Sequence, residues 1–217
     1  MKQRLQAYWH NHNEVIAIAI TAFFLIAGVV QYAFGLRYVL SLTPLVIGAI
    51  TAVTLLYWQA PARNKVLLFV TAFVIGMLSE IIGVNSALLF GDYSYGSVLG
   101  LKIGGVPVLI GVTWAFVTVA AWQLVSFSNR GTLAKILFGA GVIVMFDLVL
   151  EQYATAFGLW QWQDGIIPLK NYITWFVVGA LLLSLYAEYG RQETPSLYGA
   201  SALPLTALFF WLMLLVR

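Results

Sequence analysis

Three acidic side chains lie inside long apolar stretches of the sequence: Glu80, Asp147 and Glu151. Because Glu151 follows Asp147 by four residues, a helix presents both carboxyls on one face. Water-poor surroundings disfavour the charged form of a carboxyl, and acids within membrane segments usually have a functional role. A neutral acid beside a better hydrated carboxylate can donate a proton and activate water at the same site. The three residues are therefore candidates for acid–base catalysis, with hydrogen bonding between helices as the structural alternative, above all for Glu151.

The composition indicates a membrane protein. Of the 217 residues, 62% are hydrophobic and 9% are charged, whereas soluble domains have about a quarter charged residues. A membrane-spanning helix needs about 20 mainly apolar residues, and the apolar stretches here are continuous rather than alternating, which favours helices over a β-barrel. We predict an all-α polytopic helix bundle that forms a single domain over residues 1–217. Its seven predicted transmembrane helices are Glu14–Phe34, Tyr38–Trp58, Val66–Gly83, Val106–Ser128, Thr132–Ala156, Tyr172–Glu188 and Ser196–Val216.

These helices place the acids near one face of the membrane. At about 1.5 Å per residue, Glu80 and Asp147 lie roughly 21–23 Å along the third and fifth predicted helices, which run in the same direction. Two longer connections, 84–105 and 157–171, lie on that face and carry one acid each. We expect five acids to converge there, namely Glu80, Asp92, Asp147, Glu151 and Asp164. The remaining three are expected to be solvated at the opposite face, namely Glu14, Glu188 and Glu193.

Other residue types narrow the chemistry and the topology. The absence of cysteine excludes disulfides, thiolate nucleophiles and iron–sulfur clusters. Every lysine lies outside a predicted helix or, like Lys135, in its first turn, so none lies in a helix interior, which excludes a retinal Schiff base. The formal net charge of +3 reflects basic residues at helix ends and not a nucleic-acid-binding surface. Seven Lys and Arg residues on the N-terminal face against four on the other favour a multi-pass protein of the cell (inner) membrane with a cytoplasmic N-terminus.

The glycine-rich and aromatic segments have simpler first interpretations. Residues 91–96 and 104–107 are typical of turns. Trp160, Trp162 and Trp175 fit the aromatic belt at a membrane interface. A minority of the aromatic side chains could instead line a ligand tunnel, where a ring face stabilises a cation.

Two blocks of sequence surround the predicted acids. The first contains SEIIGVNS (79–86), LFGDYSY (89–95) and GGVP (104–107), and the second contains DLVLE (147–151), WQW (160–162), IPLKNY (167–172) and WF (175–176). Together they resemble the two signatures of the membrane carotenoid hydratases of the CruF type. Gln152 departs from that pattern, which often has a proline after the acid, and this departure concerns the local bend of the fifth helix.

The resemblance implies addition of water to the terminal double bond of an acyclic carotenoid, giving a tertiary alcohol without a cofactor or a metal. The partners would be the lipophilic carotenoid, the lipid bilayer and other enzymes of carotenoid synthesis. Asp147 or Glu80 would donate the proton, while the other acid and Glu151 hold or deprotonate the incoming water. The candidates for binding or positioning the substrate are Asn85, Asp92, Tyr93, Trp114, Trp160, Asp164, Asn171 and Trp175.

Other functions remain open on the residues alone. Asp147-x-x-x-Glu151 matches half of the Asp-rich magnesium motif of membrane prenyltransferases or carotenoid elongases, but a second motif with basic residues nearby is missing. A lycopene cyclase would also protonate a terminal double bond, and would then close a ring. Intramembrane acids also occur in proton-linked transporters, and a carotenoid-binding protein would leave its ligand unchanged. The mass of the product separates these functions.

Overall fold

Seven helical segments confirm the predicted all-α polytopic bundle. The computed structural model describes the backbone of residues 2–189 and 194–217 and the side chains of residues 12–189 and 194–217. Within these residues, seven segments are long and apolar enough to cross a membrane, the second of which combines the 3₁₀-helix η1 with α2. The helices are α1 (Lys2–Ala33), η1 (Arg37–Leu42), α2 (Thr43–Tyr57), α3 (Ala62–Ser86), α4 (Val108–Ser126), α5 (Thr132–Ala156), α6 (Leu169–Tyr189) and α7 (Leu197–Leu215).

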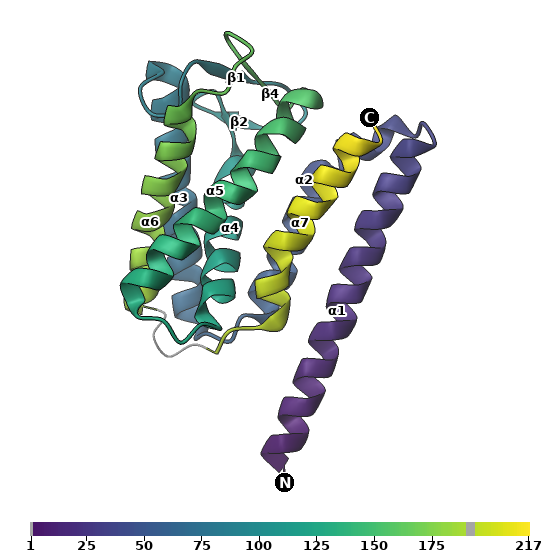
Figure 1. Ribbon diagram of the computed structural model, residues 1–217, viewed down its shortest axis with the longest axis vertical. Helices are drawn as coiled ribbons and strands as arrows, with labels where there is room; N and C mark the ends of the chain where they lie inside the picture. Colours follow the sequence, from purple (N-terminus) through teal and green to yellow (C-terminus); the bar gives the residue numbers. More distant parts are fainter. Residues whose placement is uncertain (1, 190–193) are drawn as a thin grey trace.

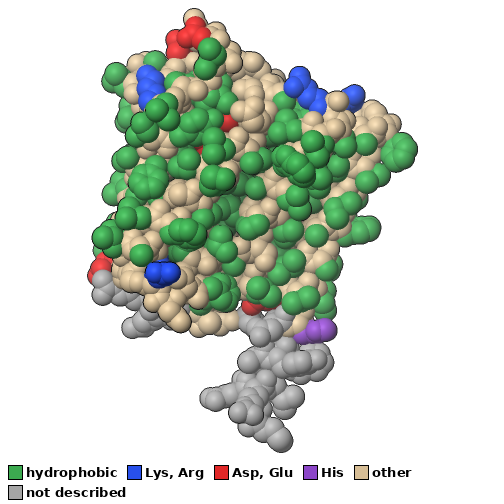
Figure 2. All heavy atoms as spheres, viewed as in Figure 1, with side chains coloured by type: hydrophobic (Ala, Val, Ile, Leu, Met, Phe, Trp, Pro, Cys, Tyr) green, Lys and Arg blue, Asp and Glu red, His purple; other side chains and the backbone are tan. Residues whose placement is uncertain are grey.

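The surface of the bundle is apolar in the middle and charged at the ends. Figure 2 shows hydrophobic side chains over the central zone, with most of the visible acidic and basic side chains near the two ends. Phe23 and Phe24 are each 67% exposed, as expected for side chains that face lipid. Helix α3 begins at Ala62, four residues before the predicted Val66. Lys65 lies in its first turn and donates from Nζ to the carbonyl oxygen of Leu55 at 2.8 Å, which satisfies its charged group at the end of the helix.

Helix α4 lies at the centre of the bundle and packs against α2, α3, α5, α6 and α7. Trp114 of α4 is fully buried. It packs directly against Gly76 of α3, where an added Cβ would lie 2.4 Å from the Trp114 side chain. Small residues of this kind let two membrane helices approach closely. Helix α1 stands at the edge of the molecule beside α7 (Figure 1).

Two short β-pairs lie at one end of the bundle (Figure 1). Strand β1 (Tyr93–Tyr95) pairs antiparallel with β4 (Trp160–Trp162), so that Tyr93 opposes Trp162 and Tyr95 opposes Trp160. Strands β2 (Lys102–Ile103) and β3 (Val106–Pro107) form a hairpin. Its turn residues Gly104 and Gly105 have φ of 59° and 86°, as a two-residue hairpin turn requires.

The connections correct part of the sequence interpretation. A turn is right for residues 104–105 but wrong for residues 93–95, which form a strand because their pairing partner comes from the other long connection. The helices that follow also start differently, since residues 106–107 form β3 and α6 begins at Leu169.

Glu14 is a second correction, because it is buried and not solvated. It is 2% exposed, and one carboxylate oxygen accepts a hydrogen bond from the Tyr198 backbone N–H at 2.8 Å. Tyr198 lies in the first turn of α7, where free backbone N–H groups favour a negative charge. Glu188 is exposed as predicted, and Glu193 lies outside the described residues.

Candidate functional site

Glu80 is a buried carboxyl that accepts hydrogen bonds from three aromatic side chains. It lies on α3 and is 3% exposed. The Tyr93 and Tyr95 hydroxyls both donate to Oε2, at 2.5 Å and 2.7 Å, and Trp114 Nε1 donates to Oε1 at 3.0 Å. An ionised carboxylate only accepts hydrogen bonds, and donors directed at both of its oxygens stabilise its charge.

Asp147 and Glu151 form a second buried group on α5 and are 0% and 3% exposed. The Asn171 side-chain amide on α6 lies between them, with Nδ2 at 2.8 Å from Asp147 Oδ2 and 3.3 Å from Glu151 Oε1. Glu151 Oε2 also accepts hydrogen bonds from Trp160 Nε1 and Trp162 Nε1, both at 2.9 Å. Asp147 Oδ1 is buried without a hydrogen-bond partner among the described residues. Because burying two like charges together is costly, ionisation of one of these two acids disfavours ionisation of the other.

The β1–β4 pair explains how four of these donors reach the carboxyls. Side chains alternate between the two faces of a strand, and in both strands the first and third residues are buried while the middle one is exposed. The inner face of the pair therefore presents Tyr93, Tyr95, Trp160 and Trp162 to the acids. The two tyrosines bind the acid of α3, and the two tryptophans bind an acid of α5.

Burial also acts on the two tyrosines, which lie in a connection outside the membrane-spanning helices. Burial raises the pKa of Tyr93 and of Tyr95 well above the usual range, and the neighbouring charge of Glu80 raises both further. Both hydroxyls therefore stay protonated at physiological pH and remain hydrogen-bond donors.

A small cavity lies among these groups. Its volume is about 20 Å³, which is enough for one water molecule. Glu80 and Glu151 line it, together with Tyr93, Tyr95, Ile110, Thr113, Leu150, Trp160, Trp162, Asn171 and Trp175. Asp147 does not line this cavity and lies behind Asn171. Glu80 and Glu151 are therefore the two acids that can contact a molecule bound there.

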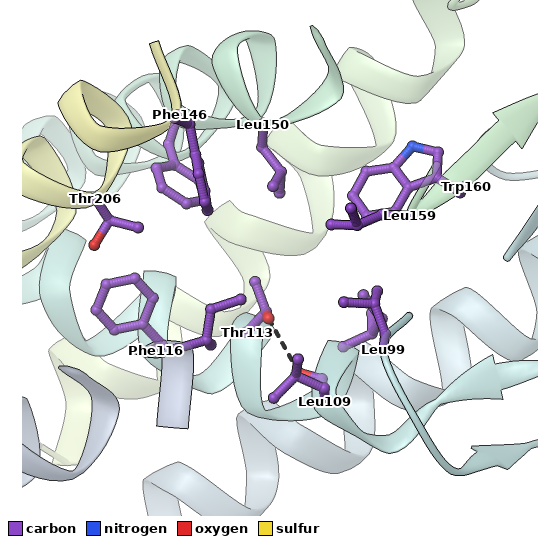
Figure 3. Close-up of a pocket in the computed structure, with 12 residues that line it drawn as sticks. Leu99, Leu109, Thr113, Phe116, Phe146, Leu150, Leu159, Trp160 and Thr206 are labelled. Atoms are coloured by element: carbon purple, nitrogen blue, oxygen red, sulfur yellow. Dashed lines mark hydrogen bonds between the residues drawn. The ribbon is translucent and has the colours of Figure 1, made fainter. Parts of the chain in front are cut away.

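An apolar pocket adjoins the polar cavity and shares Ile110, Thr113, Leu150 and Trp160 with it. Its remaining walls come from α2, α4, α5, α7 and the connections. Figure 3 shows Phe146, Leu150 and Trp160 facing Phe116, Thr113 and Leu99 across this pocket. Its volume is also about 20 Å³, so the surrounding side chains must move apart before a branched hydrocarbon end can bind.

The structure brings together most of the predicted site residues. Tyr93, Trp160, Asn171 and Trp175 line the cavity with Glu80 and Glu151, and Trp114 binds Glu80 while stacking on Trp175 at a centroid distance of 4.0 Å. The aromatic-belt interpretation is wrong for Trp160, Trp162 and Trp175, which are buried at 5–7% exposure.

Three other candidates lie outside the cavity and are exposed, namely Asn85, Asp92 and Asp164. Asp92 and Asp164 lie in the connections that carry β1 and β4, at the end of the bundle where the five acids were expected, but they are exposed, whereas Glu80, Asp147 and Glu151 are buried. Asn85 donates from Nδ2 to the carbonyl oxygens of Ile81 and Gly104, at 2.8 Å and 3.0 Å, and so holds the β2–β3 turn against α3.

Two site residues were missed by sequence reasoning as binding groups, namely Tyr95 and Trp162. The signal is present in the sequence as two aromatic–polar–aromatic triplets, Tyr-Ser-Tyr and Trp-Gln-Trp. Such alternation is typical of a strand with one buried face, but three residues are too few to distinguish it from a turn.

The site contains no arrangement that indicates a metal centre. Within the described part of the chain, no group of three or more His, Asp or Glu residues has a geometry that could hold a metal ion. The donors directed at Glu80 and Glu151 are phenol, indole and amide groups, which bind a carboxylate and not a cation.

Comparison with known proteins identifies the family. The fold and site define a polytopic membrane protein with a buried acid cluster beside an apolar pocket. Residues 40–217 match the family described as carotenoid biosynthesis protein, and the chain belongs to this family. It therefore has a role in carotenoid synthesis, and the seven apolar helices among its described residues fit a lipophilic substrate in a bilayer.

A curated relative gives a more specific comparison over part of the chain. The chain is 30% identical over 115 residues to a bisanhydrobacterioruberin hydratase of Haloarcula japonica. The match covers 49% of this chain and 39% of that relative, so the chain spans well under half of the relative's length in this comparison. No solved structure matches this chain.

Proposed function

We propose that the protein is a carotenoid hydratase, a hydro-lyase that adds water to the terminal double bond of an acyclic carotenoid and gives a tertiary alcohol. The observation that carries the proposal is the position of Glu80 and Glu151, two buried acids on different helices that line one water-sized cavity beside an apolar pocket. Addition of water to an isolated alkene needs a proton donor, a group that stabilises a cation and a held water molecule, without an oxidant or reductant. The partial match to a hydratase supports the same reaction.

The first step is transfer of a proton from the α5 acids to the less substituted alkene carbon. The C=C π electrons form the new C–H bond, and the adjacent carbon becomes a tertiary cation. Glu151 is the member of the Asp147–Glu151 pair that contacts the cavity, and Asn171 links it to Asp147. Glu151 donates the proton in this proposal, and Asp147 supports it by holding a proton when Glu151 has lost one.

The second step is capture of the cation by water. Glu80 is the carboxylate in this proposal. Three donors stabilise its charge, and, unlike Glu151, which also accepts three hydrogen bonds, it has no second acid one turn away on its helix. Its charge stabilises the nearby cation and orients the water. The water oxygen forms the C–O bond, Glu80 accepts the released proton, and return of that proton to the α5 pair restores the starting state. The ring faces of Trp160 and Trp175, which line the cavity, add cation–π stabilisation.

The apolar pocket is the proposed site of the carotenoid end group. Phe116, Phe146 and Phe210 line this pocket and exclude water from the part of the carotenoid beyond the reacting carbons. The cavity lies near one end of the helices, and an extended carotenoid has a length comparable to the bilayer. We place the protein in the cell membrane with its N-terminus in the cytoplasm, and other enzymes of carotenoid synthesis are its proposed partners.

Carboxyl-to-amide variants test the proposal in a host that accumulates an acyclic carotenoid. Glu80→Gln and Glu151→Gln remove the two acids that line the cavity, and Asp147→Asn removes the acid behind them. We expect the two cavity variants to lose hydration by about 100-fold or more, in the range of general acid–base catalysis. Asp92→Asn and Asp164→Asn are matched controls because these acids are exposed, and they should retain the activity of the parent chain.

Pigment masses decide between the functions. A product that has gained one water molecule, found with the parent chain and the two controls only, supports the hydratase. Undiminished hydration in both Glu80→Gln and Glu151→Gln would overturn the assignment. An isomer of unchanged mass would indicate a cyclase, a magnesium-dependent prenyl addition would indicate a prenyltransferase, and an unchanged bound pigment would indicate a binding or transport protein.

A further inference from the structure

A third and larger cavity lies next to the acid cluster and opens at the surface. Its volume is about 420 Å³, and it lies between the last turns of α5, strand β4 and the first turn of α6. Polar side chains contribute much of its wall, and exposed residues form its rim. Its lining residues are Gln152, Thr155, Gln161, Trp162, Gly165, Ile166, Ile167 and Tyr172.

Trp162 is common to this outer cavity and to the cavity at the acids. Its indole ring is 7% exposed and packs on the Tyr93 ring at a centroid distance of 5.0 Å. Its Nε1 donates to Glu151 Oε2 at 2.9 Å. One side chain therefore separates the outer cavity from the acids and also holds one of them.

Trp160 has the corresponding position on the other side of the site. Its Nε1 donates to the same oxygen of Glu151 at the same distance of 2.9 Å. Trp160, however, lines the apolar pocket and not the outer cavity. The two indoles thus border two different spaces, one apolar and one with the polar groups that ordered water requires.

We propose that the outer cavity is an aqueous vestibule and that Trp162 is the gate through which water reaches Glu80 and Glu151. The inference rests on the proposed function, because it assigns the source of the water that hydration consumes. Water enters past Trp162 from the membrane face, while the carotenoid end enters past Trp160 from the apolar side. This separation keeps bulk water from the apolar pocket.

The absence of cysteine makes the route measurable, since any introduced thiol is the sole one in the chain. Gln152→Cys places a thiol in the vestibule, and Thr113→Cys places one deep inside, where Thr113 lines both the acid cavity and the apolar pocket. The probe is a charged methanethiosulfonate, applied to the full chain in proteoliposomes. Ser128→Cys, on the connection between α4 and α5 at the opposite membrane face, is a reactive control.

We expect Gln152→Cys to react rapidly with the charged probe and Thr113→Cys to react slowly. Adding Trp162→Ala to Thr113→Cys should speed its modification by about tenfold or more, because removal of the ring opens the barrier, whereas adding Trp160→Ala should not. Adding Trp162→Phe should give an intermediate rate. Gel-filtration profiles identify folded variants. The reactivity of Ser128→Cys, unchanged when each tryptophan substitution is added to it, is the second criterion.

Three results would overturn the assignment of Trp162 as the gate for water. These are an unreactive Gln152→Cys, equal acceleration by Trp162→Ala and Trp160→Ala, or hydration that is unaffected once Gln152→Cys carries the bulky adduct. If the unmodified chain does not hydrate carotenoids at all, the proposed function fails, but the labelling rates still report whether water reaches the acids past Trp162. The two failures are therefore distinguishable.

Discussion

Tyr95→Phe removes a single hydroxyl donor from Glu80 and tests whether the aromatic donors set the state of this acid. The Tyr95 hydroxyl lies 2.7 Å from Glu80 Oε2, and both side chains are buried. A hydrogen bond to a charged group contributes about 1.5–3 kcal/mol, and each 1.4 kcal/mol corresponds to about a tenfold change. If the carboxylate form of Glu80 is needed, hydration should fall by about 10- to 100-fold.

The assay is the ratio of hydrated to unhydrated pigment over time in membranes that contain equal amounts of protein. Tyr38→Phe is the matched control, because Tyr38 is 56% exposed and its hydroxyl binds Gln31, remote from the acids. The double variant Glu80→Gln/Tyr95→Phe completes a mutant cycle. If Tyr95 acts through Glu80, the double variant should be no slower than Glu80→Gln alone.

Two results would refute this reasoning. Equal rates for Tyr95→Phe and Tyr38→Phe would show that the donor is not needed for the reaction. Fully additive losses in the double variant would show that Tyr95 acts independently of Glu80, for example by packing against Trp160, whose ring centroid lies 5.6 Å away.

Three further predictions address packing, proton sharing and pH. Gly76→Ala should displace Trp114 from Glu80, because the new Cβ would lie 2.4 Å from the tryptophan side chain. Hydration and thermal stability should both fall in this variant. The control Gly141→Ala should change neither, because its added Cβ meets nothing within 4 Å. Asn171→Leu should lower hydration by about tenfold or more, because it removes the amide that links Asp147 and Glu151. Higher activity in Asn171→Gln, which keeps an amide, would separate this role from simple packing. Parental activity in Asn171→Leu would contradict the linkage. Burial raises the pKa of Tyr93 and Tyr95 in the folded protein, so the unfolded chain loses these protons first as the pH rises above about 10. The free energy of unfolding should then fall by about 1.4 kcal/mol per pH unit for each tyrosine. Melting curves in detergent should show a shallower fall with pH for Tyr95→Phe than for the parent chain, and identical slopes in the two would refute the pKa shift.

In the proposed mechanism, the carotenoid end and the water reach Glu151 past two different tryptophan side chains. Glu151 accepts hydrogen bonds from two indoles at the same oxygen, and these indoles border the apolar pocket and the vestibule respectively. Movement of either ring would alter the contacts of the acid at the moment when the carotenoid end or water enters. Access and proton donation are therefore coupled in the proposed mechanism.

The sequence by itself determined the class of the protein and the position of its helices. Apolar stretches of about 20 residues mark membrane helices because lipid requires every backbone group to be bonded within its own segment, and this signal is local. The spacing of Asp147 and Glu151 likewise fixed their common helix face, since the helical repeat depends only on neighbouring residues.

The tertiary structure decided which residues meet at the acids. Strands β1 and β4 lie in separate connections, and their pairing brings Tyr95 and Trp162 to the site. No local pattern specifies that partner, because it depends on how α3, α5 and α6 pack. The packing of α1 against α7 buries Glu14, whereas Asp92 and Asp164 stay exposed in the connections. Glu151 lines the cavity, and Asp147, which does not, is bonded to Asn171. Helix periodicity groups side chains on one face, but only the neighbouring helices determine what that face contacts.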